Sequence, residues 1–268
     1  MPFKRCKMHG LKILLLLLLF VLISGCITAG PEKAPKALFD MGHGEIFPPN
    51  DGKPSSYTGF YYQFYSNGYD VGSLDSPITK EVLSGAKVLV AAGPMRDFSV
   101  EEIISIKDFV RNGGNLLILV HIFPPVNPLA QEFGISLSSN ITAEAKNVIN
   151  SSSLDFFIMD FVEHPITLGI KKVAVYGTWS VISNEPAKTV AWTSDSAWPD
   201  IIKNKIFDPD IENREKLGII AVAEYGRGKV LVLADDAIFI ERFMNDGDNR
   251  RFGENIIKWF KGSQIGPE

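Results

Sequence analysis

The sequence contains very little cysteine, with only Cys6 and Cys26 among its 268 residues. Both lie close to the N-terminus, ahead of the part of the chain that is expected to fold. That part therefore has no thiol, which excludes a disulfide, a thiolate metal site and a cysteine nucleophile from it.

The N-terminal apolar run is too short for an ordinary membrane span. It covers residues 13–23 and follows four cations at Lys4, Arg5, Lys7 and Lys12. The residues Ser-Gly-Cys come directly after it. A spanning helix needs about 20 apolar residues, so a retained transmembrane helix is the weaker interpretation. The pattern instead predicts a secretory signal peptide over residues 1–25.

The four residues Ile-Ser-Gly-Cys that end at Cys26 resemble the lipobox of prokaryotic lipoproteins. The resemblance implies cleavage before Cys26, lipid attachment to it, and a protein held at the outer face of the cytoplasmic membrane. Residues 26–35 would then form a short tether. An ordinary cleavage site is the alternative, but it leaves the cysteine unexplained.

The sequence also lacks an excess of basic charge. It has 27 basic and 31 acidic residues, and removal of residues 1–25 takes away four cations and no anion, which leaves a formal charge of −8. A nucleic-acid partner is therefore not expected, because such partners are bound through basic surfaces.

The rest of the sequence predicts a single α/β domain over residues 36–262, followed by a tail over residues 263–268. Short apolar strands alternate with helices up to about residue 121, which predicts a doubly wound, mostly parallel sheet of flavodoxin-like type. Residues 134–216 are rich in Ser, Asn, Pro and Asp and predict an irregular, antiparallel extension. Residues 218–225 and 229–234 predict a hairpin, and residues 250–261 an amphipathic helix.

Polar residues follow several of the predicted parallel strands. The loops at the carboxyl ends of such strands share one edge of the sheet, where α/β folds place their ligands. We expect the ligand-binding candidates to meet at this edge and to bind a carbohydrate, a small polar ligand or a divalent metal. The candidates are Asp40, His43, Glu45, His121, Asp235 and Asp236.

The alternative is that these side chains only support the turns. We favour it for Asp235 and for Asp248, because Asp commonly caps loops and helices. His164 precedes a proline and is interpreted as structural. His43 lies between two glycines in the stretch A-L-F-D-M-G-H-G-E, so we expect an exposed ring with little to pack against.

Six stretches carry a wider resemblance: F-D-M-G-H-G-E, V-L-V-A-A-G-P, R-N-G-G-N-L-L-I-L, H-P-I-T-L-G-I, Y-G-R-G-K-V-L-V-L-A-D-D-A-I-F and D-N-R-R-F-G-E-N-I-I-K-W. In order and spacing they resemble a family of class I glutamine-amidotransferase-like proteins. The family is related to auxiliary subunits of gliding-type ABC transport systems and to the amidotransferase-like domain of an intraflagellar transport protein. The resemblance implies the fold named above and a role in binding or assembly.

The catalytic elbow of amidotransferases is missing. Its counterpart follows the strand at residues 116–120 and reads His-Ile-Phe-Pro-Pro, with neither a nucleophile nor a flanking glycine. We therefore expect a lipid-anchored binding or scaffolding module with no cofactor, serving an ABC-type membrane complex or the cell envelope. The alternatives are a structural envelope protein, or a hydrolase or lyase that uses His43 and nearby carboxylates on a glycan or small polar substrate.

Overall fold

The computed structural model describes residue 1, residues 34–122 and residues 124–262. The fold lies in the part of the chain that begins at Pro35. The predicted signal peptide and Cys26 lie outside the described residues. Within the described segments, none of the helices combines the length and the apolar character that a membrane crossing requires.

Five parallel strands form one half of the central sheet, in the order β2-β1-β3-β4-β15. Their bounds are β1 Lys36–Asp40, β2 Asp70–Leu74, β3 Ala86–Ala92, β4 Asn115–Leu119 and β15 Gly228–Leu233. Strands β3 and β4 are almost continuously apolar because they lie in the middle of the sheet and are covered on both faces.

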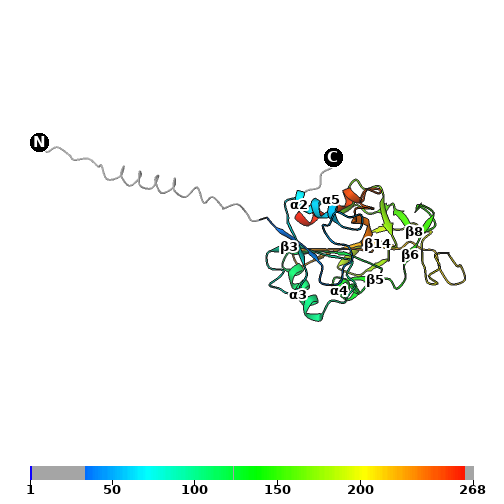
Figure 1. The fold of residues 1–268 in the computed structure, drawn as a ribbon, viewed down its shortest axis with the longest axis horizontal. Helices are drawn as coiled ribbons and strands as arrows, with labels where there is room; N and C mark the ends of the chain where they lie inside the picture. The colour runs from blue at the N-terminus through cyan, green and yellow to red at the C-terminus, as the bar shows by residue number, and fades with distance from the viewer. Residues whose placement is uncertain (2–33, 123, 263–268) are drawn as a thin grey trace. The chain divides into compact units, whose positions relative to one another are not determined.

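Helices cover both faces of this sheet. Helices α2 and α5 lie on one face, and α3 and α4 lie on the other (Figure 1). Helix α3 begins at a capping box in which the side chains of Ser99 and Glu102 each accept a hydrogen bond from the other's backbone N–H group. The bounds are α2 Thr58–Ser66, α3 Val100–Arg111, α4 Asn127–Gln131 and α5 Asn249–Lys261, with 3₁₀ turns η1 Pro165–Thr167 and η2 Ala237–Phe239.

The other half of the molecule is antiparallel. In the central sheet, β15 pairs with β14, β14 pairs with β11, and β11 pairs with β5. A branch leaves this path at β14, where β12 pairs with β14 on one side and with β9 on the other. A three-stranded sheet, β10-β8-β7, and the pair β13-β6 complete the extension. The bounds are β5 Ile135–Leu137, β6 Thr142–Ala143, β7 Val148–Ile149, β8 Ser152–Ile158, β9 Asp160–Phe161, β10 Val173–Tyr176, β11 Val181–Ser183, β12 Ala187–Trp192, β13 Trp198–Pro199 and β14 Gly218–Tyr225.

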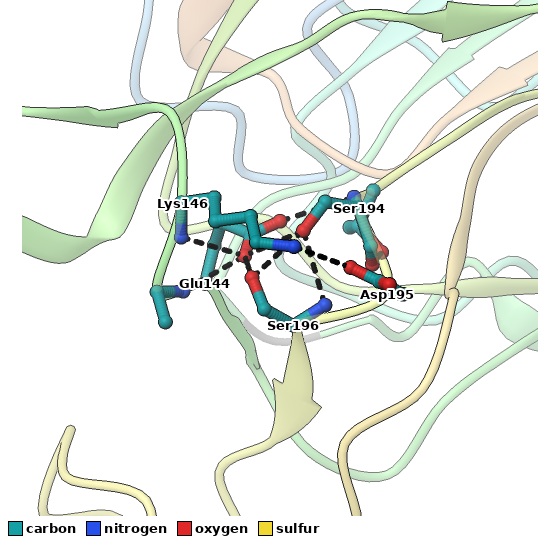
Figure 2. A network of polar contacts seen from close by, with 7 residues as sticks. Glu144, Lys146, Ser194, Asp195 and Ser196 are labelled. Atoms are coloured by element: carbon teal, nitrogen blue, oxygen red, sulfur yellow. Dashed lines mark hydrogen bonds and ion pairs between the residues drawn. The ribbon is translucent and has the colours of Figure 1, made fainter.

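The buried carboxylate of Glu144 connects two parts of the extension. Glu144 is 1 % exposed, and its two oxygens accept hydrogen bonds from the backbone N–H groups of Ala145, Lys146 and Ser194 and from the hydroxyls of Ser194 and Ser196 (Figure 2). This network joins the residues after β6 to the loop between β12 and β13. Satisfied polar groups thus add to the buried apolar side chains that hold the extension together.

The predicted mixed α/β architecture is confirmed at the level of a mostly parallel core with antiparallel additions. Strand β14 has the predicted bounds, and α5 buries Phe252, Ile256 and Ile257 as expected of an amphipathic helix.

Candidate functional site

The carboxyl ends of four neighbouring parallel strands bring the predicted residues to one edge of the sheet. Asp40 ends β1, Gly93 follows β3, His121 follows β4, and Asp235 and Asp236 follow β15. These strands are adjacent in the order β1-β3-β4-β15. The shared edge is therefore a feature of the fold, and two separate clusters of polar groups lie on it.

The first cluster is built on His43. Its Nδ1 lies 2.6 Å from Asp40 Oδ2, and its Nε2 lies 3.3 Å from Glu102 Oε1. The imidazole stacks on Phe98, with ring centroids 3.9 Å apart. Burial alone would lower the pKa of His43, but the carboxylates of Asp40 and Glu102 outweigh it and raise that pKa.

His43 is therefore not the exposed loop residue that the sequence suggests. It is only 5 % exposed, because Phe98 covers its ring and carboxylates take both of its nitrogens. The prediction of a free imidazole was wrong. The glycine on each side of His43 allows the loop to turn sharply, but contacts with residues distant in sequence determine where the imidazole lies.

Glu45 completes this cluster, and one of its oxygens has no partner. Its Oε2 accepts a hydrogen bond from the His43 backbone N–H, whereas Oε1 is buried without a hydrogen-bond partner. Burial, and then the neighbouring charge of Asp40, raise the pKa of Glu45 to about 8. The side chain is consequently protonated at neutral pH when no cation is bound.

Glu102 is a member of the cluster that sequence reasoning missed. The capping box identified it only as a helix-cap residue, and its second role depends on His43, which is distant in sequence. The backbone N–H groups of Ile78 and Ser99 hold its carboxylate. Burial alone would raise the pKa of Glu102, but these two donors and the nearby imidazole lower it.

The second cluster pairs His121 with Asp236. His121 Nδ1 lies 2.8 Å from Asp236 Oδ2, and the Tyr57 hydroxyl donates to the same oxygen at 3.5 Å. Phe47 packs edge-on against the rings of both His121 and Tyr57. Burial raises the pKa of Asp236, although the hydrogen bond from His121 opposes that shift.

A turn after β3 separates the two clusters. The backbone N–H groups of Met95 and Arg96 both donate to the His43 carbonyl. Gly93, at φ +75°, faces the second cluster, and a Cβ at this position would lie 2.3 Å from Asp236 Oδ2. Only glycine fits there, because the position combines a left-handed backbone with a close approach to a side chain.

The remaining predicted residues support the backbone. Asp235 accepts hydrogen bonds from the N–H groups of Tyr176 and Ala237, and Asp248 accepts them from Lys171 and Lys172. His164 begins the 3₁₀ turn η1 and accepts from the Ile166 N–H. Asp235, Asp248 and His164 thus each have a structural task in the fold.

The extension closes over the ends of β4 and β15. The Trp179 indole N–H donates to the His121 carbonyl at 2.9 Å, and its backbone N–H donates to the Ala234 carbonyl. These contacts fix the start of the turn after β4. In sequence the turn holds His121, Ile122 and two prolines, with neither a Cys nor a Ser.

A loop between β13 and β14 exposes several isoleucines although its backbone is fixed. The buried carboxylate of Asp200 accepts from the N–H groups of Asn204 and Lys205, and that of Glu212 accepts from Ile201 and Asp208. We call residues 201–211 the isoleucine loop. Its exposed apolar side chains are Ile201, Ile202, Ile206 and Ile211.

The fold and its strand-end edge define a class of mixed α/β domains seen in solved structures. The mmIFT52 N-terminal domain superposes with a TM-score of 0.69 at 20 % identity, covering 86 % of this chain and 100 % of that one. Cytoplasmic protein STM1381 from Salmonella typhimurium LT2 gives a TM-score of 0.55 at 16 % identity, covering 84 % and 99 %. At these identities the likeness shows a shared fold.

The chain belongs to the family described as "Domain of unknown function (DUF4350)", whose sequence model matches residues 49–257. Over 247 residues, 85 % of this chain, it is 23 % and 22 % identical to the intraflagellar transport protein 52 homologs of Mus musculus and Homo sapiens. The alignments cover 56 % and 54 % of those proteins, so the chain spans about half the length of the curated relatives it matches. The predicted similarity to an intraflagellar transport protein is confirmed.

Proposed function

We propose that this chain is a non-catalytic binding or scaffolding module of the cell envelope, held at the outer face of the cytoplasmic membrane through Cys26 as an accessory of a membrane transport complex. The observation that carries the proposal is the state of the strand-end edge. Both histidines there are buried and paired with carboxylates, and the turn after β4 offers no nucleophile. Such an edge is suited to a scaffolding role or to the binding of a small polar ligand.

The similarity to intraflagellar transport protein 52, whose name places it in a transport process, agrees with a role in assembly. We also propose that the parallel half descends from a flavodoxin-like, class I amidotransferase-like fold that has lost its catalytic elbow. The accessory role in an ABC-type system rests on the sequence resemblance alone.

The isoleucine loop is the surface that best suits a protein partner in this proposal. Ile206 is 68 % exposed, and Lys203 and Lys205 adopt left-handed backbone conformations that are rare for lysine. Two buried carboxylates hold this conformation, so the loop presents apolar side chains to solvent on a fixed backbone. Rigid exposed apolar groups are typical of interaction surfaces, because association buries them at little cost in chain entropy.

The absence of turnover is tested with the purified full-length chain. We expect no release of ammonia from glutamine above a heat-killed control, because the turn after β4 lacks a nucleophile and an oxyanion hole. Reproducible glutamine hydrolysis by independent preparations would contradict the non-catalytic assignment.

A hydrolase or lyase acting on a glycan or small polar substrate is the second candidate. The raised pKa of Glu45 favours it, since a carboxylic acid protonated at neutral pH beside a histidine is a general acid–base arrangement. A panel of aryl glycosides and small polar esters tests it. Turnover that disappears in a folded Glu45→Gln variant would support this candidate over the scaffold.

A further inference from the structure

We propose that Asp40, His43 and Glu45 form a binding site for one divalent transition-metal ion, with Zn²⁺ as the preferred ion. The scaffold role neither requires nor excludes a metal, so the inference goes beyond the proposed function. Each residue offers one ligand atom, and these three atoms lie within 4.8 Å of one another. All three residues are buried, at 1 %, 5 % and 9 % exposure.

The unpartnered oxygen of Glu45 is the observation that points to a ligand. Oε1 has no hydrogen-bond partner among the described residues, although the side chain is buried beside another carboxylate. Ionisation of Glu45 would leave a buried carboxylate oxygen without a donor and beside the second carboxylate, Asp40, and both effects are costly. A cation between Asp40 and Glu45 would compensate both costs.

Backbone N–H groups hold one oxygen of each carboxylate. The Gly42 N–H holds Asp40 Oδ1, and the His43 N–H holds Glu45 Oε2. Glu45 Oε1 has no partner among the described residues, and Asp40 Oδ2 lies 2.6 Å from His43 Nδ1, which is itself a proposed ligand atom. Backbone donors that fix one oxygen of a ligating carboxylate are a common feature of metal sites.

Glu102 orients the imidazole of His43 for metal binding. Its Oε1 lies 3.3 Å from His43 Nε2 and can accept the hydrogen of that nitrogen. Nδ1, now 2.6 Å from Asp40 Oδ2, is then the nitrogen that gives up its hydrogen when an ion binds. A carboxylate behind the imidazole is the usual partner of a metal-binding histidine. Stacking on Phe98 fixes the plane of the ring.

The donor set and the spacing favour a small transition-metal ion. One imidazole nitrogen and two carboxylate oxygens suit Zn²⁺, whereas Ca²⁺ and Mg²⁺ prefer oxygen ligands alone. Two ligands at about 2.1 Å from a tetrahedral ion lie roughly 3.4 Å apart. The present 2.6 Å between His43 Nδ1 and Asp40 Oδ2 must therefore open when the ion binds.

Calorimetric titration of ZnCl₂ into the tag-free full-length chain, solubilised in detergent and stripped of metal, tests the site. We expect one Zn²⁺ per chain, a higher melting temperature, and an affinity at least about 100-fold weaker in Glu45→Gln. Glu101→Gln removes a nearby exposed carboxylate that is outside the cluster and should bind Zn²⁺ like the wild type. Asp40→Asn replaces Glu45→Gln if that variant does not fold. Absence of binding by the wild type, or unchanged binding by both cluster variants, would overturn the proposal.

Discussion

At the scale of single residues, burial sets the chemistry of the strand-end clusters. Glu45 illustrates this, because burial, and then the neighbouring charge of Asp40, raise its pKa to about 8. An ordinary glutamate titrates near 4.5, so between these two values the unfolded chain has released a proton that the folded chain keeps. The free energy of unfolding must therefore fall as pH rises through this interval.

Glu45→Gln removes that dependence because glutamine stays neutral. In a chelating buffer, we expect the variant to gain stability relative to the wild type as pH rises from about 5 to about 8. Denaturant unfolding at both pH values measures the difference, and Glu101→Gln should show no comparable gain. A stability difference between Glu45→Gln and wild type that does not change with pH would contradict the raised pKa.

Gly93 gives a second prediction at this scale. Alanine at this position places a Cβ 2.3 Å from Asp236 Oδ2 in a left-handed backbone at φ +75°. Gly177 has nearly the same φ, +73°, with no atom within 4 Å of the Cβ position. Gly177→Ala should cost about 1–2 kcal/mol from the backbone alone, and Gly93→Ala roughly 2–4 kcal/mol. Equal losses in thermal denaturation would show that the close approach to Asp236 does not matter.

The sequence predicted which residues lie at the strand ends, but not their environments. Asp40, His121 and Asp236 could be placed because parallel strands share an edge. The burial of His43 could not, because Phe98 and Glu102 reach it from another strand–helix connection. The neighbouring glycines suggested an exposed His43 side chain, and no local pattern indicated the aromatic ring that covers the imidazole.

At the scale of elements, apolar runs and capping residues predicted the parallel half well. The capping box of α3 and the hairpin of β14 and β15 depend on neighbours in sequence. The extension was predicted only as irregular and antiparallel, because its short strands are tied by polar contacts. The bonds between Glu144 and the serines 194 and 196 span 50 and 52 residues, which local patterns do not encode.

Glu144→Gln tests the importance of this network. The glutamine amide presents a donor to N–H and hydroxyl groups that now donate to a carboxylate, so we expect a loss of roughly 2–4 kcal/mol in the free energy of unfolding. Asp195→Asn is the control, because its ion pair with Lys146 is exposed and should contribute little. If both variants unfold at the same denaturant concentration, Glu144 does not hold the extension.

At the scale of the whole molecule, Cys26 is the proposed attachment point to the membrane. Cys26→Ser tests the anchor. Stable attachment requires more than one lipid chain, at about 0.8 kcal/mol per buried CH₂, and all of them depend on this sulfur. We expect altered processing of the precursor and release of the domain from membranes in cell fractionation. Unchanged processing and retention would contradict lipid attachment.

The most direct test of the scaffold assignment is the state of the chain in native membranes. Membranes are solubilised in mild detergent, and the particle that contains the chain is sized and its components are identified by mass spectrometry. The account predicts a complex with a membrane transport or envelope protein at fixed stoichiometry, lost when Ile206→Asp charges the isoleucine loop and retained when the exposed Tyr62 is replaced in a Tyr62→Asp control. A wild-type chain that migrates alone, with no partner dependent on Ile206, would contradict it.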